Sequence, residues 1–408
     1  MIGEKLFCGL DIGSQRIKAS LTKFKKPASF EVIAAGDIPT RGLKNDSVTD
    51  LGELSESVQL CCHDLMRRAG VRFKDVKIGI SGHAVYTRCS RTVIPLSDKG
   101  SKVIARNHIE KVKRDACLLG IKMEEEILHH FPLHYTIDDH HTVVNPLGLH
   151  GHKMETQLLL IISKEDVLSN VVKAVNQAGF DVTSVYYSSY AAAQATLDKK
   201  QKKDGCIFLD VGASITSLSI FKEGQLHQLE IIPSGGNEIT LRIAESLNLP
   251  FDLAEEIKKS YAVAVAEDAI KREEILVKKE SAYVPIRREL ICQAVEPKIK
   301  DFVQRIQDTL MNSPIFKEIS SEIVMVGGGS LLPGLIELIE HTMKVRVRMG
   351  KFSTASSNLN NPAIYSAAVG LTIGDTIAKG MDLLSAGEQQ KRLTIISNRF
   401  RELYHEYF

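Results

Sequence analysis

Two aspartates, Asp11 and Asp210, each lie near the end of an apolar stretch that turns at a glycine and returns as a second apolar stretch. This pattern predicts a tight β-hairpin with a carboxylate at its base. In the first copy Gly13 and Ser14 form the tip, where backbone N–H groups can point at a phosphate without an intervening Cβ. The carboxylate can hold a hydrated Mg²⁺, and Lys18 on the returning strand can neutralise phosphate charge.

The second hairpin repeats the first in register. When Asp11 is placed over Asp210, Gly13 falls over Gly212 and apolar residues match on both sides. Either copy alone is equally well explained as an ordinary hairpin turn, but two copies in register favour a duplicated, two-lobed fold.

A third stretch, Ile323–Val326, is apolar and runs directly into Gly327, Gly328 and Gly329, after which a helical pattern begins. Strand, glycine turn and helix is the layout that allows close approach of the backbone to a nucleotide. The alternative is a plain connection between strand and helix, which rarely needs three consecutive glycines.

Composition restricts the class of protein. The 408 residues can form two or more domains, and 44% apolar with 25% charged residues is typical of a soluble globular chain. A net charge of +2 gives no support to nucleic-acid binding. The seven scattered cysteines predict reduced thiols in a cytoplasmic protein, and the early first strand leaves no room for a secretory signal.

Two polar segments interrupt the pattern of strands and helices. Residues 82–163 include a histidine-rich run, since seven of the thirteen histidines lie between His129 and His152. His130 and His134 could share a helix face and bind a metal, but Pro132 breaks that helix and no cysteine accompanies them, so we expect a loop of solvated histidines instead. The charge run at 198–204 is likewise expected to be a solvated loop.

The last 18 residues, 391–408, follow a polar linker at 381–390 and place apolar side chains at helical spacing. The apolar stripe consists of Leu393, Ile396, Phe400, Leu403, Tyr404 and Tyr407. With cations largely off the stripe, this is the pattern of an interfacial helix that binds an anionic membrane surface. The alternative is a helix packed on its own protein.

Taken in order, the two hairpins and the glycine turn resemble the ATPase superfamily of actin, hexokinase and the heat-shock chaperones. Within it the chain is similar to the FtsA family of bacterial cell-division proteins over nearly its whole length. The stretches that carry this resemblance are 40–43 with 48–51, Tyr135–Asp138, Asn145–Gly151 and Ile232–Asn237.

The resemblance implies an α/β, actin-like two-lobed fold of duplicated mixed sheets with covering helices and an inserted IC subdomain. It divides the chain into IA (1–81 and 164–198), IC (82–163), IIA (199–231 and 300–380), IIB (232–299), the linker (381–390) and the amphipathic helix (391–408).

The resemblance also implies ATP and Mg²⁺ as ligands, with Asp11 and Asp210 holding Mg²⁺ through water. Asp11, Gly13, Ser14 and Lys18 would form the first phosphate loop, Asp210, Gly212, Ser214 and Thr216 the second, and Gly235, Gly236, Glu255, Lys258 and Gly327–Gly329 would surround ribose and adenine. Ala213 and Ser214 replace two family glycines, and residues 187–191 offer no carboxylate to orient water. We therefore expect ATP binding with at most slow hydrolysis.

The implied partners are the C-terminal peptide of FtsZ, other copies of the chain in a filament, the anionic inner face of the cell membrane at the septum, and other division proteins. Arg287 and Arg288 in subdomain IIB are candidate contacts for the acidic peptide. Two alternatives stay open: a pilus-assembly actin homologue of the PilM kind, and a metabolite kinase of the same superfamily.

Overall fold

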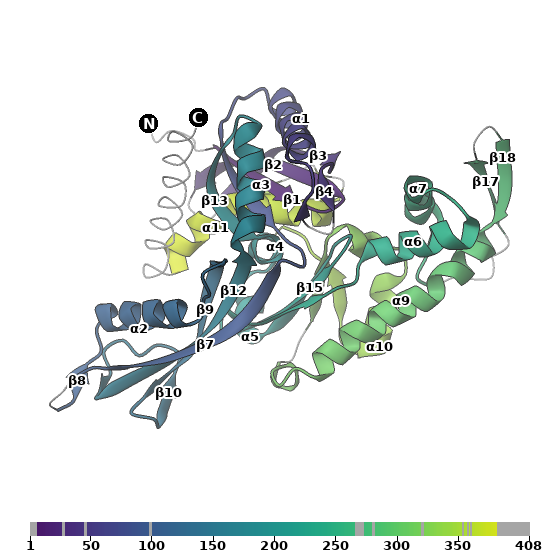
Figure 1. The fold of residues 1–408 in the computed structure, drawn as a ribbon. Coiled ribbons are helices and arrows are strands. Elements are labelled where there is room, and N and C mark those ends of the chain that lie inside the picture. Colours follow the sequence, from purple (N-terminus) through teal and green to yellow (C-terminus); the bar gives the residue numbers. More distant parts are fainter. Residues whose placement is uncertain are drawn as a thin grey trace. The chain divides into compact units, whose positions relative to one another are not determined.

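The computed structural model describes residues 6–26, 29–44, 47–97, 100–265, 273–279, 282–319, 322–352, 355–356, 359 and 361–381. The chain forms two compact units. Unit 1 comprises residues 1–198, 225–228 and 352–408, and unit 2 comprises residues 199–224 and 229–351. Figure 1 labels many of the elements of both units.

Unit 1 is built on a six-stranded mixed sheet in the order β13-β6-β1-β2-β3-β21. Its strands are β1 (Leu6–Ile12), β2 (Arg16–Lys26), β3 (Ser29–Pro39), β6 (Asp75–Ile80), β13 (Asp181–Tyr187) and β21 (Ala355–Ser356), and a short hairpin of β4 (Leu43–Lys44) and β5 (Ser47–Val48) follows β3. β1 pairs antiparallel with β2 and parallel with β6, which places Asp11 opposite Lys18. The first predicted hairpin is therefore confirmed.

Helices cover this sheet. α1 (Leu51–Ala69) packs against β2, β3 and α3 (Glu165–Gln177), whereas α11 (Ser366–Met381), which follows the 3-10 turn η3 (Pro362–Tyr365), packs against β1, β2, β6 and α4 (Ser188–Thr196). α1 begins where the carboxylate of its N-cap, Asp50, accepts a hydrogen bond from the Glu53 amide at 2.9 Å.

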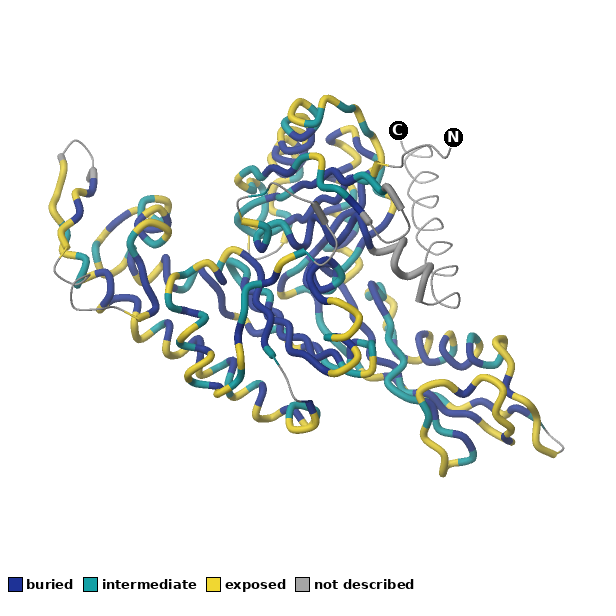
Figure 2. Tube along the Cα trace, turned by 180° about the vertical axis from the view of Figure 1, so that it is seen from behind, coloured by how far each residue is buried: buried dark blue, intermediate teal, exposed yellow. Residues whose placement is uncertain are grey.

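A second sheet of unit 1, the inserted sheet, has the order β10-β9-β12-β7. Its strands are β7 (Val85–Pro95), β9 (Glu125–Ile137), β10 (His141–Val143) and β12 (Lys153–Lys164); α2 (Arg106–Leu119) lies along it, and β8 (Lys102–Val103) pairs with β11 (His150–Gly151). In Figure 2 the tip of this region is exposed, whereas the strands behind it are largely buried.

The histidine-rich stretch is only in part the solvated loop that the sequence suggested: His140, His141, His150 and His152 are exposed, but the first three histidines are not in a loop. His129, His130 and His134 lie in strand β9, and His129 is only 4% exposed. Pro132 is tolerated because the pairing of β9 with β12 shifts register next to it, as at a β-bulge. Among the residues that the structure describes, no group of three or more His, Cys, Asp or Glu side chains could hold a metal ion.

Unit 2 is built on a five-stranded sheet in the order β16-β15-β14-β19-β20. The strands are β14 (Cys206–Val211), β15 (Thr216–Lys222), β16 (Gln225–Ile232), β19 (Ile323–Val326) and β20 (Val347–Met349). The helices are α5 (Lys199–Asp204), α6 (Gly236–Leu247), α7 (Phe251–Tyr261), α9 (Arg288–Met311) and α10 (Leu335–Met343), with 3-10 turns η1 (Phe316–Glu318) and η2 (Gly328–Leu331) and a separate hairpin of β17 (Glu274–Lys279) and β18 (Ala282–Arg287). The second predicted hairpin is confirmed, since β14 and β15 pair antiparallel with Asp210 opposite Ser217.

The charge run at 198–204 is not a solvated loop either, because residues 199–204 form helix α5 and Lys202 is only 6% exposed. The Lys202 and Lys203 carbonyls accept hydrogen bonds from the Gly224 and Glu223 amides at 2.9 and 3.0 Å. The helix is thus held against the turn between β15 and β16, so its lysines are not all solvated.

All seven cysteines lie in the described part of the chain and are free thiols. No helix of that part is long and apolar enough to cross a bilayer. The predicted amphipathic helix at 391–408 and its linker from 382 onward lie outside the described residues.

Candidate functional site

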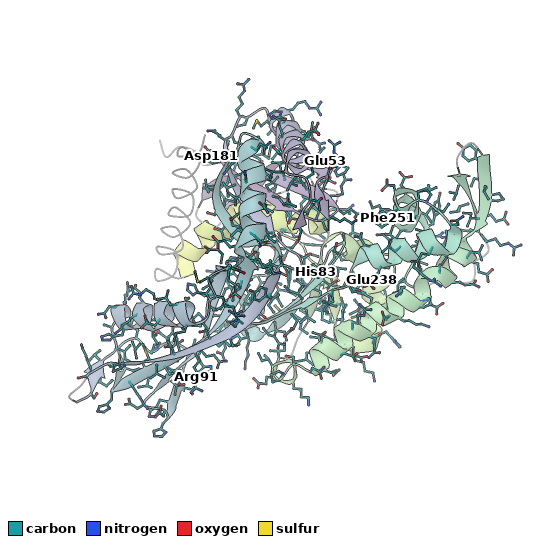
Figure 3. The ribbon with its side chains drawn as sticks, viewed as in Figure 1. Glu53, His83, Arg91, Asp181, Glu238 and Phe251 are labelled. Atoms are coloured by element: carbon teal, nitrogen blue, oxygen red, sulfur yellow. The ribbon has the colours of Figure 1, made fainter. Side chains whose placement is uncertain are left out.

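In unit 2 the turn of the second hairpin is held by the start of α6. The Gly236 amide donates to the Gly212 carbonyl at 3.0 Å, and the Asn237 amide donates to the Ala213 carbonyl at 2.8 Å. These are two of the N–H groups that a helix leaves unpaired at its N-terminus. They orient the turn itself, so α6 positions the turn through its backbone (Figure 3 labels Glu238 in the first turn of α6 and Phe251 at the start of α7).

Glycines allow the backbone segments around this turn to approach one another. A Cβ at Gly235 would lie 2.7 Å from both the Gly212 and the Ala213 carbonyl oxygens. At Gly327, which has a φ of +87°, a Cβ would lie 2.4 Å from the Val211 carbonyl oxygen. These distances are too short for any side chain, so close approach requires both glycines, and the positive φ favours glycine at Gly327 as well.

Asp210 lies at the carboxyl end of β14, next to the glycine turn that follows β19. The two strands are parallel and pair Asp210 with Val326, and a Cβ at Gly327 would lie 2.7 Å from Asp210 Oδ1. Gly328 is exposed, and a Cβ there would meet nothing within 4 Å. In open α/β sheets, ligands bind outside the carboxyl ends of the strands. A half-buried carboxylate beside an open glycine suits a hydrated cation and its anionic ligand.

Below this turn lies a buried polar cluster formed by Thr240, Glu255 and Lys258. The Lys258 ammonium donates to the Gly236 carbonyl at 3.1 Å and to Thr240 Oγ1 at 2.9 Å, and lies 2.6 Å from Glu255 Oε2. Burial lowers the pKa of Lys258. Burial raises the pKa of Glu255, but the charge and hydrogen bonds of Lys258, with hydrogen bonds from Thr240 and Lys259, outweigh burial and hold that pKa below its ordinary value.

The first hairpin gives unit 1 a similar turn. Asp11 is 5% exposed; its Oδ1 accepts a hydrogen bond from Ser188 Oγ at 2.7 Å, and its Oδ2 accepts one from Lys18 Nζ at 3.4 Å. The Thr40 hydroxyl donates to the Gly13 carbonyl at 2.7 Å, and the Thr40 amide donates to the Gln15 carbonyl at 3.0 Å. Thr40 therefore holds the turn from behind.

The structure gathers the predicted residues into two groups. In unit 1 it brings together Asp11, Gly13, Ser14 and Lys18; in unit 2 it brings together Asp210, Gly212, Ser214, Gly235, Gly236, Glu255, Lys258 and Gly327–Gly329. Thr216 is fully buried and donates to the Ser234 carbonyl at 2.8 Å, which directs its hydroxyl into the fold.

The two arginines of the β17–β18 hairpin differ. Arg288 donates to the Tyr261 carbonyl at 2.9 Å and pairs with Glu273 at 2.5 Å, so it ties the hairpin to the end of α7. Arg287 has a 70% exposed side chain and lies 3.7 Å from Glu274. Of the two arginines, Arg287 is therefore the one with an exposed side chain.

Ser188, Thr40 and Thr240 were missed by the sequence reasoning. Thr40 is the first residue of the stretch 40–43 that carries the family resemblance, so the sequence marked its position but did not indicate its role. Ser188 is 177 residues from Asp11, and no local pattern joins the two. Thr240 could have been found from its position one helical turn after Gly236 on α6.

Known structures of the same architecture identify the class. The structure titled "PilM-PilN type IV pilus biogenesis complex" matches with a TM-score of 0.64 at 19% identity, covering 90% of this chain and 98% of that one. MreB5 of Spiroplasma citri bound to ADP matches with a TM-score of 0.52 at 14% identity, covering 93% and 99%. The fold is therefore that of the actin-like ATPases.

Sequence comparison gives the family. One family model, cell division protein FtsA, matches residues 207–370, and another, the SHS2 domain inserted in FtsA, matches 82–162. The cell division protein FtsA of Pseudomonas aeruginosa is 29% identical over 90% of this chain and 88% of its own length, and that of Escherichia coli is 25% identical over 96% and 94%. This chain belongs to the FtsA family of cell division proteins.

Proposed function

We propose that this protein binds Mg²⁺ and ATP, polymerises, anchors FtsZ filaments to the cytoplasmic face of the cell membrane at the division septum, and helps to recruit later septation proteins. The observation that carries the nucleotide part is the site in unit 2, where Asp210 lies beside glycines whose backbones approach too closely for any side chain.

Each residue has a distinct task in this proposal. The Gly212–Ser214 turn and the open face at Gly328 accept the phosphates and the nucleoside, and Asp210 holds Mg²⁺ through water. The bound Mg²⁺ neutralises phosphate charge. Lys258 and Glu255 keep the Gly236 backbone in place, so they support the nucleoside side of the site from below. The assignment of Asp11 and Lys18 to the same nucleotide rests on the sequence repeat.

Turnover is proposed to be slow at most. Residues 187–191 hold no carboxylate, and Ser188 in that stretch already donates to Asp11. A water aligned for attack on the γ-phosphate therefore lacks an evident orienting group there.

The membrane part of the proposal rests on the sequence of residues 391–408. A single short amphipathic helix binds bilayers weakly and reversibly. Polymerisation would array many such helices along one filament and raise their avidity without new contacts. The polymer would then stay on the membrane where a monomer dissociates.

The proposed cargo site is the region 232–299. Arg287 is the better of the two predicted contacts for an acidic FtsZ peptide, since its side chain is exposed while Arg288 is held by Tyr261 and Glu273. A pilus-assembly role is the second candidate, because the PilM–PilN structure shares the fold over 98% of its own length. A metabolite kinase has no such support.

Liposome co-sedimentation tests the anchor. The intact protein should pellet with anionic vesicles, and a version that ends at Gln390 should stay in solution. Phe400→Glu, on the apolar stripe, should reduce pelleting, whereas Asn398→Glu, off the stripe, is the matched control with the same added charge. Equal pelleting of the intact and shortened proteins would refute the anchor and favour the PilM-like alternative.

A further inference from the structure

The junction between β13 and α4 connects the inserted sheet with the first phosphate turn. Ser188, the first residue of α4, donates its hydroxyl to Asp11 Oδ1 at 2.7 Å. Tyr187, the preceding residue, donates its amide N–H to His129 Nε2 at 3.0 Å. Two consecutive residues of the chain thus join a carboxylate of the candidate site to strand β9 of the inserted sheet.

His129 acts here as a hydrogen-bond acceptor. A backbone amide can only donate, so the ring is neutral and its proton resides on Nδ1. Burial, with a smaller effect from His130, lowers the pKa of His129 to about 3. The acceptor therefore persists at every physiological pH, and the connection is permanent in the folded protein.

An aromatic cluster fixes the ring of His129 in this position. Its centroid lies 4.7 Å from that of Tyr190, 5.6 Å from Tyr186 and 6.1 Å from Phe131, and Phe131 lies 4.9 Å from Tyr190. The rings come from β9, β13 and α4. Because interiors are densely packed, β9 cannot shift without moving the residues that precede and follow Ser188.

We propose that His129 is a positioning residue through which the inserted sheet controls the orientation of Asp11. When β9 shifts, the Tyr186–Tyr187 peptide, which carries the donated N–H group, must either follow His129 or leave that buried N–H group without a partner, which is unfavourable. The peptide therefore follows, and the hydroxyl of Ser188 moves relative to the carboxylate of Asp11. The consequence for ligand affinity rests on the proposed function, in which Asp11 contacts the Mg²⁺–nucleotide.

The test uses the full chain with three substitutions at β9. His129→Phe keeps an aromatic ring but removes the acceptor, His129→Gln keeps an acceptor, and Phe131→Leu loosens the cluster while retaining the His129 hydrogen bond. The first readout, without nucleotide, is the NMR signal of the ¹³C-labelled Asp11 carboxylate, assigned with Asp11→Asn. The second is the affinity for Mg²⁺–ATP.

We expect His129→Phe to move the Asp11 signal and to weaken Mg²⁺–ATP binding by about three- to thirtyfold, the range of couplings carried through packed networks. His129→Gln should restore both toward the wild-type values, and Phe131→Leu should lower the melting temperature without changing either. An Asp11 signal that His129→Phe leaves in place, or that Phe131→Leu moves equally, would overturn the proposal.

The two readouts separate this inference from the proposed function. If His129→Phe moves the Asp11 signal but neither the wild type nor any variant binds Mg²⁺–ATP, the positioning role stands and the nucleotide assignment fails. If His129→Phe does not fold, Ser188→Ala decides from the other end: it must shift the ring ¹⁵N signals of His129, and unchanged signals would exclude the connection.

Discussion

Alanine substitutions in the Gly327–Gly329 turn distinguish a turn shaped around a ligand from one that is only a connection. At Gly327 a Cβ would lie 2.4 Å from the Val211 carbonyl oxygen and 2.7 Å from Asp210 Oδ1, in a backbone with φ of +87°. At Gly329 the nearest atom would be Val211 Cγ1 at 2.5 Å, and at Gly328 nothing lies within 4 Å.

These distances rank the expected losses of stability. Gly327→Ala combines a backbone conformation that costs other residues about 1–3 kcal/mol with a clash against backbone, so we expect a loss of about 3 kcal/mol or more. At its closest contact Gly329→Ala meets a side-chain methyl group of Val211 and not the backbone, and we expect about 1–2 kcal/mol. Gly328→Ala should stay within about 0.5 kcal/mol of the wild type.

The three variants should rank differently in their affinity for Mg²⁺–ATP than in their stability. If the nucleotide lies over the open face of the turn, the methyl group of Gly328→Ala blocks that approach and weakens binding roughly tenfold, equivalent to about 1.4 kcal/mol. A well-folded variant with poor binding is the expected signature of a ligand site.

Urea unfolding with pulsed hydrogen exchange and mass spectrometry measures stability here, since peptides from β14 and β19 report on unit 2 alone and the two units need not unfold together. Calorimetric titration of Mg²⁺–ATP measures affinity. Wild-type affinity in Gly328→Ala, or equal stability of Gly327→Ala and Gly328→Ala, would refute the reasoning.

Three further predictions follow from named contacts. Burial lowers the pKa of His129 to about 3, whereas the unfolded side chain titrates near 6.5. Between these values the unfolded state binds more protons, so the folded protein loses stability as pH falls below 6.5. Relative to His129→Gln, urea unfolding of unit 1 should show a loss of about 2 kcal/mol at pH 5. A pH-independent difference would contradict this. Lys258→Met leaves Glu255 buried with a weaker set of partners and should lower the free energy of unfolding by about 2–4 kcal/mol, measured by thermal unfolding. Adding Glu255→Gln should restore part of that stability, and no restoration would show that the two residues are not coupled. Arg288→Ala should increase hydrogen exchange in β17 and β18 by removing bonds to Tyr261 and Glu273, whereas Arg287→Ala should not, and equal exchange in the two variants would reverse the roles assigned to them.

The hairpins and the glycine turn could be predicted because their signals are local. Alternation of apolar residues fixes β1 with β2 and β14 with β15, and a glycine run after a buried strand marks a turn wherever it occurs. α1 carries a local signal of the same kind, since its N-cap Asp50 directly precedes apolar residues at helical spacing. For these elements the neighbouring sequence contains all the necessary information.

The contacts that shape the sites were not predictable in this way. The Ser188–Asp11 hydrogen bond depends on which strand ends the fold brings together, and the burial of His129 and Lys202 depends on packing against distant elements. Lysine is mostly exposed and histidine is intermediate, so residue type alone did not predict burial at either position. Tertiary packing overrode the local preference there.

Calorimetric titration of Mg²⁺–ATP into the wild-type protein and into Asp210→Ala tests the central claim most directly. Asp204→Ala, which removes an exposed carboxylate paired with Lys200 in the same unit, is the control. We predict one Mg²⁺-dependent site in the wild type and in Asp204→Ala, and clearly weaker binding in Asp210→Ala. Equal Mg²⁺–ATP affinity in all three proteins, or no binding by the wild type, would contradict the nucleotide site in unit 2.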